Sequence, residues 1–246
     1  MKSSYHSLLF LCCILAVPFF TTGRGQAKTK RRTMKLQDKT RMSYTVVLPE
    51  KYDKQRVYPI LLALPPGPQT GEMVERGLDG FWREQAQSRG WIVVSPVAPH
   101  GKLFFQGSEA YLPEFLDKIA QEFPPEGGKF YLAGISNGGI SAFRVALNWP
   151  ERFHALLALP GFPADRDFQR LERLKQIPVA MFGGGEDVGW VVQMQQAQRR
   201  LKELNGHVTL KVFPGEGHLV RSLVGGKLLF DLLESFRRDT KKTSNP

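Results

Sequence analysis

The stretch Lys129-Phe-Tyr-Leu-Ala-Gly-Ile-Ser-Asn-Gly-Gly139 decides how the rest of the chain is interpreted. It reads as a short apolar strand, then a G-x-S-x-G pattern, then a helix. A serine on a sharp turn between a strand and a helix presents its Oγ to a substrate, and the residues two positions away on either side must be small. Gly134 and Gly138 meet that need. The pattern therefore predicts that Ser136 is a nucleophile.

Segments with strand and helix patterns alternate on both sides of this stretch. Because alternating strands and helices indicate βαβ crossovers, the sequence predicts an α/β fold. We expect a doubly wound, mostly parallel sheet with helices on both faces and no large lid. Strands are predicted over residues 42–49, 58–64, 91–95, 130–133, 155–159, 178–182 and 208–213, and helices over 72–88, 109–123, 140–148, 167–175, 190–204 and 219–236.

Ligands of an open parallel sheet bind beyond the carboxyl ends of the strands. A histidine that follows a strand is therefore a candidate for the site, whereas one that precedes a strand lies at the opposite edge. His218 directly follows the last predicted strand, within Pro214-Gly-Glu-Gly-His218, and we expect it to be the catalytic base. His154 and His207 precede their strands and are interpreted as structural or surface residues. His100 follows a strand, and it is either a substrate contact or an ordinary loop residue.

The acid partner of the histidine is expected at the same edge of the sheet. Asp187 ends a glycine-rich loop that follows a predicted strand, and it is the best candidate to orient the histidine and stabilise its cation. Glu186 is the alternative because it is adjacent and differs by one methylene, whereas Asp165 and Asp167 are less favoured. A serine hydroxyl is a weak nucleophile without such a base and its partner. The three groups are therefore predicted to act together.

These motifs together resemble the α/β-hydrolase superfamily, over roughly residues 42–236. The chain order Ser136, Asp187, His218 agrees with that of the superfamily. Within it, the run that begins at Ser136 is similar to carboxylesterases and phospholipases, and to feruloyl esterases and polyhydroxyalkanoate depolymerases. The resemblance implies a serine esterase that cleaves small-molecule or polymeric carboxylic esters through an acyl-enzyme, without a cofactor.

The loop after the strand ending at Leu64 departs from the pattern of the superfamily, where His-Gly usually precedes a backbone donor of the oxyanion hole. Here the chain reads Pro65-Pro66-Gly67-Pro68-Gln69, and proline has no N–H to donate. We expect Gly67 to be the donor, with Gln69 as the second choice, and Asn137 N–H to be the other donor.

Trp190 either lines the substrate pocket or packs at the start of its helix. The candidate pocket residues are Gln69, His100 and Trp190.

Two other functions fit the same pattern. One is a serine peptidase on this fold; such peptidases often carry a propeller or cap domain, for which the predicted elements leave no segment. The other is a non-catalytic binding protein with a hydrolase fold, an interpretation that the unusual proline-rich loop keeps open. No metal-binding pattern such as H-E-x-x-H or paired cysteines appears, so no metal site is predicted.

The first residues differ in kind from the rest. Residues 8–20 are apolar throughout and shorter than the about 20 residues that span a bilayer as a helix. They fit the apolar region of a secretory signal peptide over residues 1–23, which predicts a secreted or periplasmic protein. An uncleaved membrane anchor formed by residues 8–20 is the alternative. Because Cys12 and Cys13 both lie in this segment, the mature protein would have no cysteine.

Most of the net charge of +11 lies near the two ends of the chain. Residues 24–35 carry +6 and residues 237–246 carry +3. No aromatic residue interrupts the basic run at 28–35, so nucleic-acid binding is not expected. The ends are interpreted as solvated tails, or as a weak contact with an anionic surface such as lipid head groups. After the signal peptide, the sequence predicts a basic flexible segment over 24–40, a hydrolase domain over 41–238 and a polar tail over 239–246.

Overall fold

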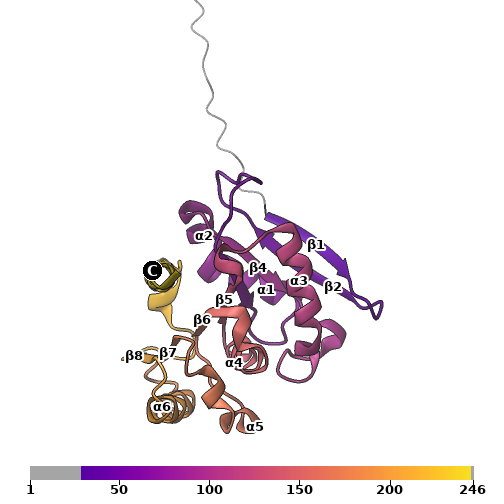
Figure 1. Cartoon of the computed structure of the whole chain (residues 1–246). Helices are drawn as coiled ribbons and strands as arrows, with labels where there is room; N and C mark the ends of the chain where they lie inside the picture. The colour runs from indigo at the N-terminus through magenta and orange to yellow at the C-terminus, as the bar shows by residue number, and fades with distance from the viewer. Residues whose placement is uncertain (1–28, 245–246) are drawn as a thin grey trace, which may run out of the picture.

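An eight-stranded sheet runs through the computed structural model, which describes residues 29–244 (Figure 1). The strand order is β1-β2-β4-β3-β5-β6-β7-β8. Strands β3 to β8 pair in parallel, whereas β1 and β2 run antiparallel to their neighbours. The predicted mostly parallel α/β sheet is therefore confirmed. The strands are β1 (Thr29–Lys35), β2 (Arg41–Val47), β3 (Ile60–Leu64), β4 (Ile92–Pro96), β5 (Phe130–Gly134), β6 (Phe153–Ala158), β7 (Val179–Gly184) and β8 (Val208–Phe213).

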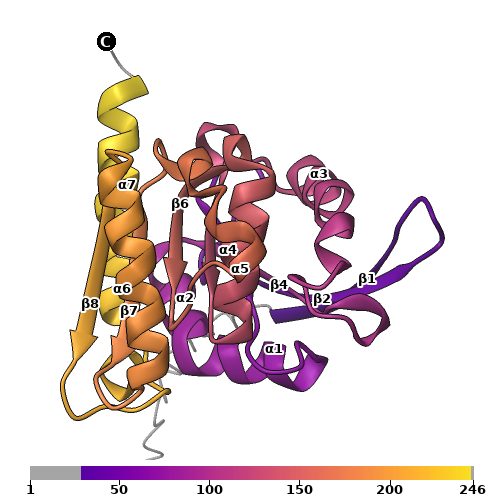
Figure 2. The same cartoon turned by 90° about the horizontal axis from the view of Figure 1, so that it is seen from below.

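Helices cover both faces of this sheet (Figure 2). Helices α3, α4 and α6 pack on one face, and α1, α2 and α7 pack on the other. Side chains of β3 alternate between the two cores: Ile60 points to the first and Leu61 to the second. A strand covered on both faces is apolar at every position, which explains the continuous runs in the sequence. The helices are α1 (Gly71–Gly77), α2 (Arg83–Arg89), α3 (Leu112–Glu122), α4 (Asn137–Asn148), α5 (Asp165–Phe168), α6 (Val188–Glu203) and α7 (Lys227–Ser244).

Two of the predicted helices are interrupted. A π-helical turn, Leu78–Trp82, joins α1 to α2 within the helix predicted over 72–88. The helix predicted over 167–175 is replaced by the short α5 and a 3-10 turn, Leu171–Leu174. Apolar spacing places a helix correctly but does not reveal where its hydrogen-bonding pattern changes.

The first described residues form a strand, so the prediction of a flexible basic segment over 24–40 is wrong for this part. β1 pairs with β2 from Thr29 opposite Val47 to Lys35 opposite Arg41. Without β1, the outer edge of β2 would present unpaired backbone groups. Arg31 and Arg32 also form ion pairs, with Glu75 and Glu122 respectively. The domain therefore begins at least twelve residues before the predicted boundary at residue 41; residues 24–28 lie outside the described residues.

The C-terminal end is helical where a polar tail is predicted over 239–246. Helix α7 continues through Ser244. Arg237 and Lys241 both pair with Glu126, the latter at 2.9 Å. These contacts extend the helix past the predicted domain end and neutralise part of the basic charge. The contact with an anionic surface stays a prediction.

The predicted signal peptide, both cysteines and the alternative membrane anchor lie outside the described residues. Within residues 29–244, no helix has the length and apolar character needed to cross a membrane.

Candidate active site

The nucleophile candidate sits on a tight turn between β5 and α4. Ser136 lies directly before α4 and has φ 56° and ψ −119°, a conformation that is rare for a residue with a side chain. A Cβ atom on Gly134 would lie 1.9 Å from the carbonyl oxygen of Gly138. A Cβ atom on Gly138 would lie 2.2 Å from the carbonyl oxygen of Leu64. The predicted need for small residues on both sides of the serine is therefore confirmed by backbone contacts.

We expect Gly138→Ala to lower kcat/KM at least about 100-fold, since a 1 Å displacement of reacting groups can have that effect. The added methyl group meets backbone atoms of Leu64 and Pro65, which cannot move aside as a flexible side chain can. Ester hydrolysis by the purified variant measures the effect. Gly80→Ala is the matched control because a Cβ atom there meets nothing within 4 Å. Equal activity of both variants would contradict the packing argument.

The structure brings the three predicted catalytic residues into one hydrogen-bonded row. Ser136 follows β5, Asp187 follows β7 and His218 follows β8, all at the carboxyl edge of the sheet. The distance between His218 Nε2 and Ser136 Oγ is 2.8 Å, and that between His218 Nδ1 and Asp187 Oδ2 is 2.6 Å. This arrangement lets the imidazole accept the serine proton while the carboxylate fixes the tautomer of the ring.

The neighbouring acids take other roles. The side chain of Glu186 is exposed, and its N–H donates to the carbonyl of Glu216 at 2.9 Å. Asp167 is fully buried and accepts a hydrogen bond of 2.6 Å from Arg144 Nε. Of the acids considered, it is Asp187 that contacts His218.

The loop that carries the histidine is fixed against the end of β7. A Cβ atom on Gly184 would lie 2.1 Å from the carbonyl oxygen of Gly217, so glycine is required for this close approach. Glu216 accepts hydrogen bonds from the hydroxyl and the N–H of Ser222. The bond from the Ser222 hydroxyl lowers the pKa of Glu216, which keeps this carboxylate charged within the loop. The position of His218 therefore depends on backbone packing and on this local pair.

The proline-rich loop faces the beginning of α4. Within residues 29–244 the N–H of Gly67 has no hydrogen-bond acceptor. The N–H of Asn137 is the first of α4, and the first N–H groups of a helix lack partners within the helix. The side chain of Asn137 donates from Nδ2 to the carbonyl oxygen of Gly67 at 3.0 Å. Both predicted oxyanion donors thus lie on segments joined by a direct hydrogen bond.

Two predictions for Gln69 are wrong. Its N–H donates to the carbonyl oxygen of Pro66 at 3.1 Å, so this group closes a turn and is not a free oxyanion donor. Its side chain is 0% exposed and therefore does not line a substrate pocket. The run of polar and proline residues suggests a solvent-facing loop, whereas the loop folds inward against α4.

Trp190 lies beside the histidine, and His100 does not. The Trp190 and His218 rings meet edge to face with centroids 4.7 Å apart, and Phe162 packs on Trp190 at 4.9 Å. His100 instead contacts Thr40 Oγ1 at 3.2 Å and the ring of Tyr111 at 5.8 Å. Trp190 and Phe162 form one wall beside the triad. Phe162 could have been proposed because it follows β6 at the same edge.

Comparison with known proteins bears on the fold of the chain. No family model matches the chain. It is 29% identical over 151 residues to a dipeptidyl-peptidase 5 of Porphyromonas gingivalis, an alignment that spans 54% of this chain and 21% of that protein. An S-formylglutathione hydrolase from Agrobacterium tumefaciens superposes with a TM-score of 0.69 at 18% identity, covering 87% of this chain and 96% of the other. The chain has the α/β-hydrolase fold. The dipeptidyl peptidase 4 of P. gingivalis also superposes, with a TM-score of 0.66 at 14% identity, over 86% of this chain and 35% of that one.

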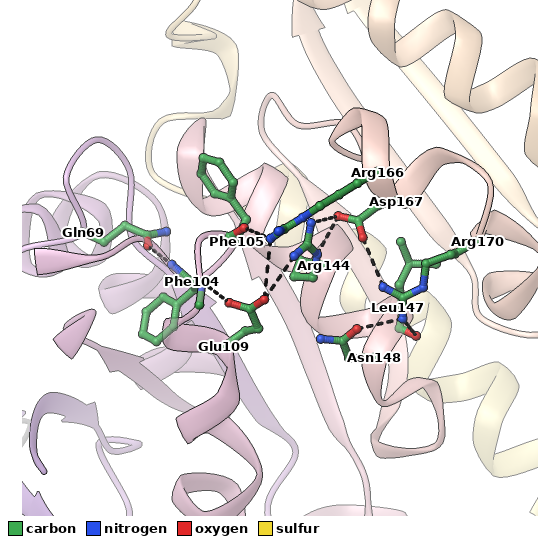
Figure 3. Close-up of polar contacts among 11 residues, drawn as sticks. Gln69, Phe104, Phe105, Glu109, Arg144, Leu147, Asn148, Arg166, Asp167 and Arg170 are labelled. Atoms are coloured by element: carbon green, nitrogen blue, oxygen red, sulfur yellow. Dashed lines mark hydrogen bonds and ion pairs between the residues drawn. The ribbon is translucent and has the colours of Figure 1, made fainter. Parts of the chain in front are cut away.

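The structure of this chain contains a second set of polar contacts that the sequence did not reveal. Arg144 on α4 is 4% exposed and bonds Asp167 on one side and Glu109 on the other, the latter at 3.1 Å (Figure 3). Glu109 also accepts from the N–H of Gly107 at 2.6 Å. The helix after the nucleophile is thereby joined to the loop before α3. The available signal was that Arg144 is the single charged residue of α4.

Proposed function

We propose that the protein is a serine hydrolase that cleaves carboxylic esters through an acyl-enzyme. Ser136 Oγ attacks the ester carbonyl carbon as its proton passes to His218 Nε2. The carbonyl oxygen gains the negative charge and accepts hydrogen bonds from the N–H groups of Gly67 and Asn137. The alcohol leaves with the proton from His218. Water then repeats the sequence on the acyl-enzyme and releases the acid.

The single observation that carries this proposal is the row of two short hydrogen bonds from Ser136 through His218 to Asp187. A fold of this kind hosts many functions, so it is the residues of the site that indicate the reaction. The intact row also weighs against the non-catalytic binding protein, because such a protein needs none of the three groups in this geometry.

A serine peptidase is the second candidate, and one specific observation favours it. The curated relative is a dipeptidyl-peptidase 5, although this chain matches only 21% of its length. Peptide bonds require the same acyl-enzyme chemistry with an amine as leaving group. The proposal of an ester substrate is supported by the likeness to a ferulic acid esterase, of which this chain covers 99% with a TM-score of 0.65 at 18% identity.

The substrate test uses unactivated esters, because activated esters react with peptidases as well. We expect methyl and ethyl esters of short acids to be hydrolysed and dipeptidyl p-nitroanilides to be left intact. Acid release is followed by pH-stat titration, and p-nitroaniline by absorbance. Ser136→Ala supplies the background for each substrate. Turnover of the anilide that this variant loses would favour the peptidase over the esterase.

Export remains part of the proposal and rests on the sequence of residues 1–23 alone. Contact of the basic ends with an anionic surface is likewise proposed from the sequence alone. Four of the basic residues already form ion pairs within the protein: Arg31, Arg32, Arg237 and Lys241.

A further inference from the structure

Gln69 is buried where the proposed mechanism has no use for it. Its side chain is 0% exposed and its φ is 56°, a left-handed conformation that is uncommon outside glycine. A buried amide is costly unless its polar atoms are hydrogen-bonded, and here both are. The side chain is thus fixed by specific partners, two residues away from the proposed oxyanion donor Gly67.

The direction of every hydrogen bond through Gln69 is determined by backbone groups. Phe104 N–H can only donate, so the atom that faces it at 2.8 Å is Gln69 Oε1. Nε2 therefore faces Ser141 and donates to its Oγ at 2.9 Å. The Ser141 hydroxyl in turn donates to the carbonyl oxygen of Asn137 at 2.8 Å. No member of this series can reverse without losing a bond.

The series closes into a ring at the proposed oxyanion hole. It runs from Gln69 to Ser141, then to Asn137, and the Asn137 side chain returns to the carbonyl of Gly67 at 3.0 Å. Gly67 and Gln69 are joined by the turn that the Gln69 N–H closes on Pro66. The two residues that would bind the oxyanion are therefore both members of one hydrogen-bonded ring.

A second set of contacts holds the other end of the Gln69 amide. Phe104, which donates to it, lies in the loop that leads to Glu109 (Figure 3). Arg166 donates to the carbonyl oxygen of Phe105, and Glu109 pairs with Arg144 on α4. The Gln69 side chain is thus anchored to the nucleophile helix twice, directly through Ser141 and indirectly through this loop.

We propose that Gln69 is a positioning residue that sets the N–H of Gly67 relative to the N–H of Asn137, through Ser141. This role rests on the proposed function, since it presumes an oxyanion between the two donors. It also differs from the His-Gly of the resemblance: here a loop whose three prolines lack N–H groups is held by a buried amide. Because the donors act only when they are aimed at the developing charge, small displacements lower catalysis.

The test compares Gln69→Met and Ser141→Ala with the wild-type protein on ethyl acetate and on a trifluoromethyl ketone. Methionine keeps the length of the side chain and removes both amide groups. The ketone accepts Ser136 Oγ at its carbonyl carbon, the serine proton moves to His218, and the ketone oxygen becomes an oxyanion. Its affinity therefore reports on the oxyanion hole. Gln176→Met, at an exposed position on the opposite edge of the sheet, is the matched control.

We expect both variants to lower kcat roughly 10- to 100-fold, less than the complete loss of a donor, and to weaken ketone binding by the same factor. KM for the ester should change less than about threefold. Active sites are counted by fluorophosphonate titration, and kcat is calculated per active site, so that misfolded protein does not lower the measured kcat.

If the variants have fewer active sites but an unchanged kcat per site and an unchanged affinity for the ketone, the positioning role is overturned. The proposed function would still stand. If Gln69→Met does not fold, Ser141→Ala decides by the same criterion. A wild-type protein that neither hydrolyses the ester nor reacts with the fluorophosphonate would overturn both proposals.

Discussion

Ser136→Ala should abolish ester hydrolysis, with a loss in kcat of about 10⁶-fold, the size found when the nucleophile of a serine hydrolase is removed. The alanine keeps the backbone and removes the one atom that can form the acyl-enzyme. In the wild-type protein the Ser136 hydroxyl forms a hydrogen bond only with His218 among the described side chains, so its removal should leave the fold unaffected. Initial rates with ethyl acetate, corrected for spontaneous hydrolysis, measure the loss.

Ser88→Ala is the control for this change. Ser88 is exposed on α2, and its Oγ donates to the carbonyl oxygen of Glu84 at 2.9 Å, away from the triad. It should retain the wild-type rate. Residual turnover of more than one hundredth by Ser136→Ala, at an equal melting temperature, would show that another group attacks the ester.

Asp187→Asn has the second-largest expected effect, a fall in kcat of about 10⁴-fold. The carboxylate accepts the hydrogen bond of 2.6 Å from His218 Nδ1 and balances the charge of the imidazolium. An amide of the same shape carries no charge and can present an N–H to the ring, which would stabilise the wrong tautomer. The measurement is kcat for ethyl acetate across the neutral pH range.

Glu186→Gln is the matched control, because it makes the same chemical change at the adjacent residue. The Glu186 side chain is exposed, and within residues 29–244 it makes no hydrogen bond or ion pair with a member of the triad. Its kcat should stay within about threefold of the wild-type value, as surface changes usually have small effects. If Glu186→Gln lost more activity than Asp187→Asn, the carboxylate assigned here would be the wrong one.

The parts of the fold that the sequence predicts are those with a local cause. Apolar runs such as the one ending at Leu64 mark strands that are covered on both faces. Gly134 is required by the close approach of the Gly138 carbonyl oxygen, which lies only four residues away in the sequence. Sites in parallel sheets form at the carboxyl ends of the strands. Asp187 and His218 both follow strands, so they could be expected near the serine although neither is near it in sequence.

The parts that could not be predicted depend on contacts between distant segments. β1 carries four basic residues and lacks an apolar alternation, and it becomes a strand because β2 presents a free edge. Gln69 is polar and follows three prolines, yet Ser141 and Phe104 complete its hydrogen bonds in the interior. Propensity and pattern carry no information about such partners, which lie 72 and 35 residues away.

The most direct measurement for the account as a whole is fluorophosphonate labelling of the intact protein, followed by peptide mapping of the adduct. The phosphorus atom is attacked by an activated serine, and the fluoride leaves, so the label marks the nucleophile itself. We predict one adduct per chain, on Ser136, that is absent from Ser136→Ala and formed far more slowly by Asp187→Asn. An adduct on a different residue, or none on a folded wild-type protein, would contradict the assignment of Ser136, His218 and Asp187 as a catalytic triad.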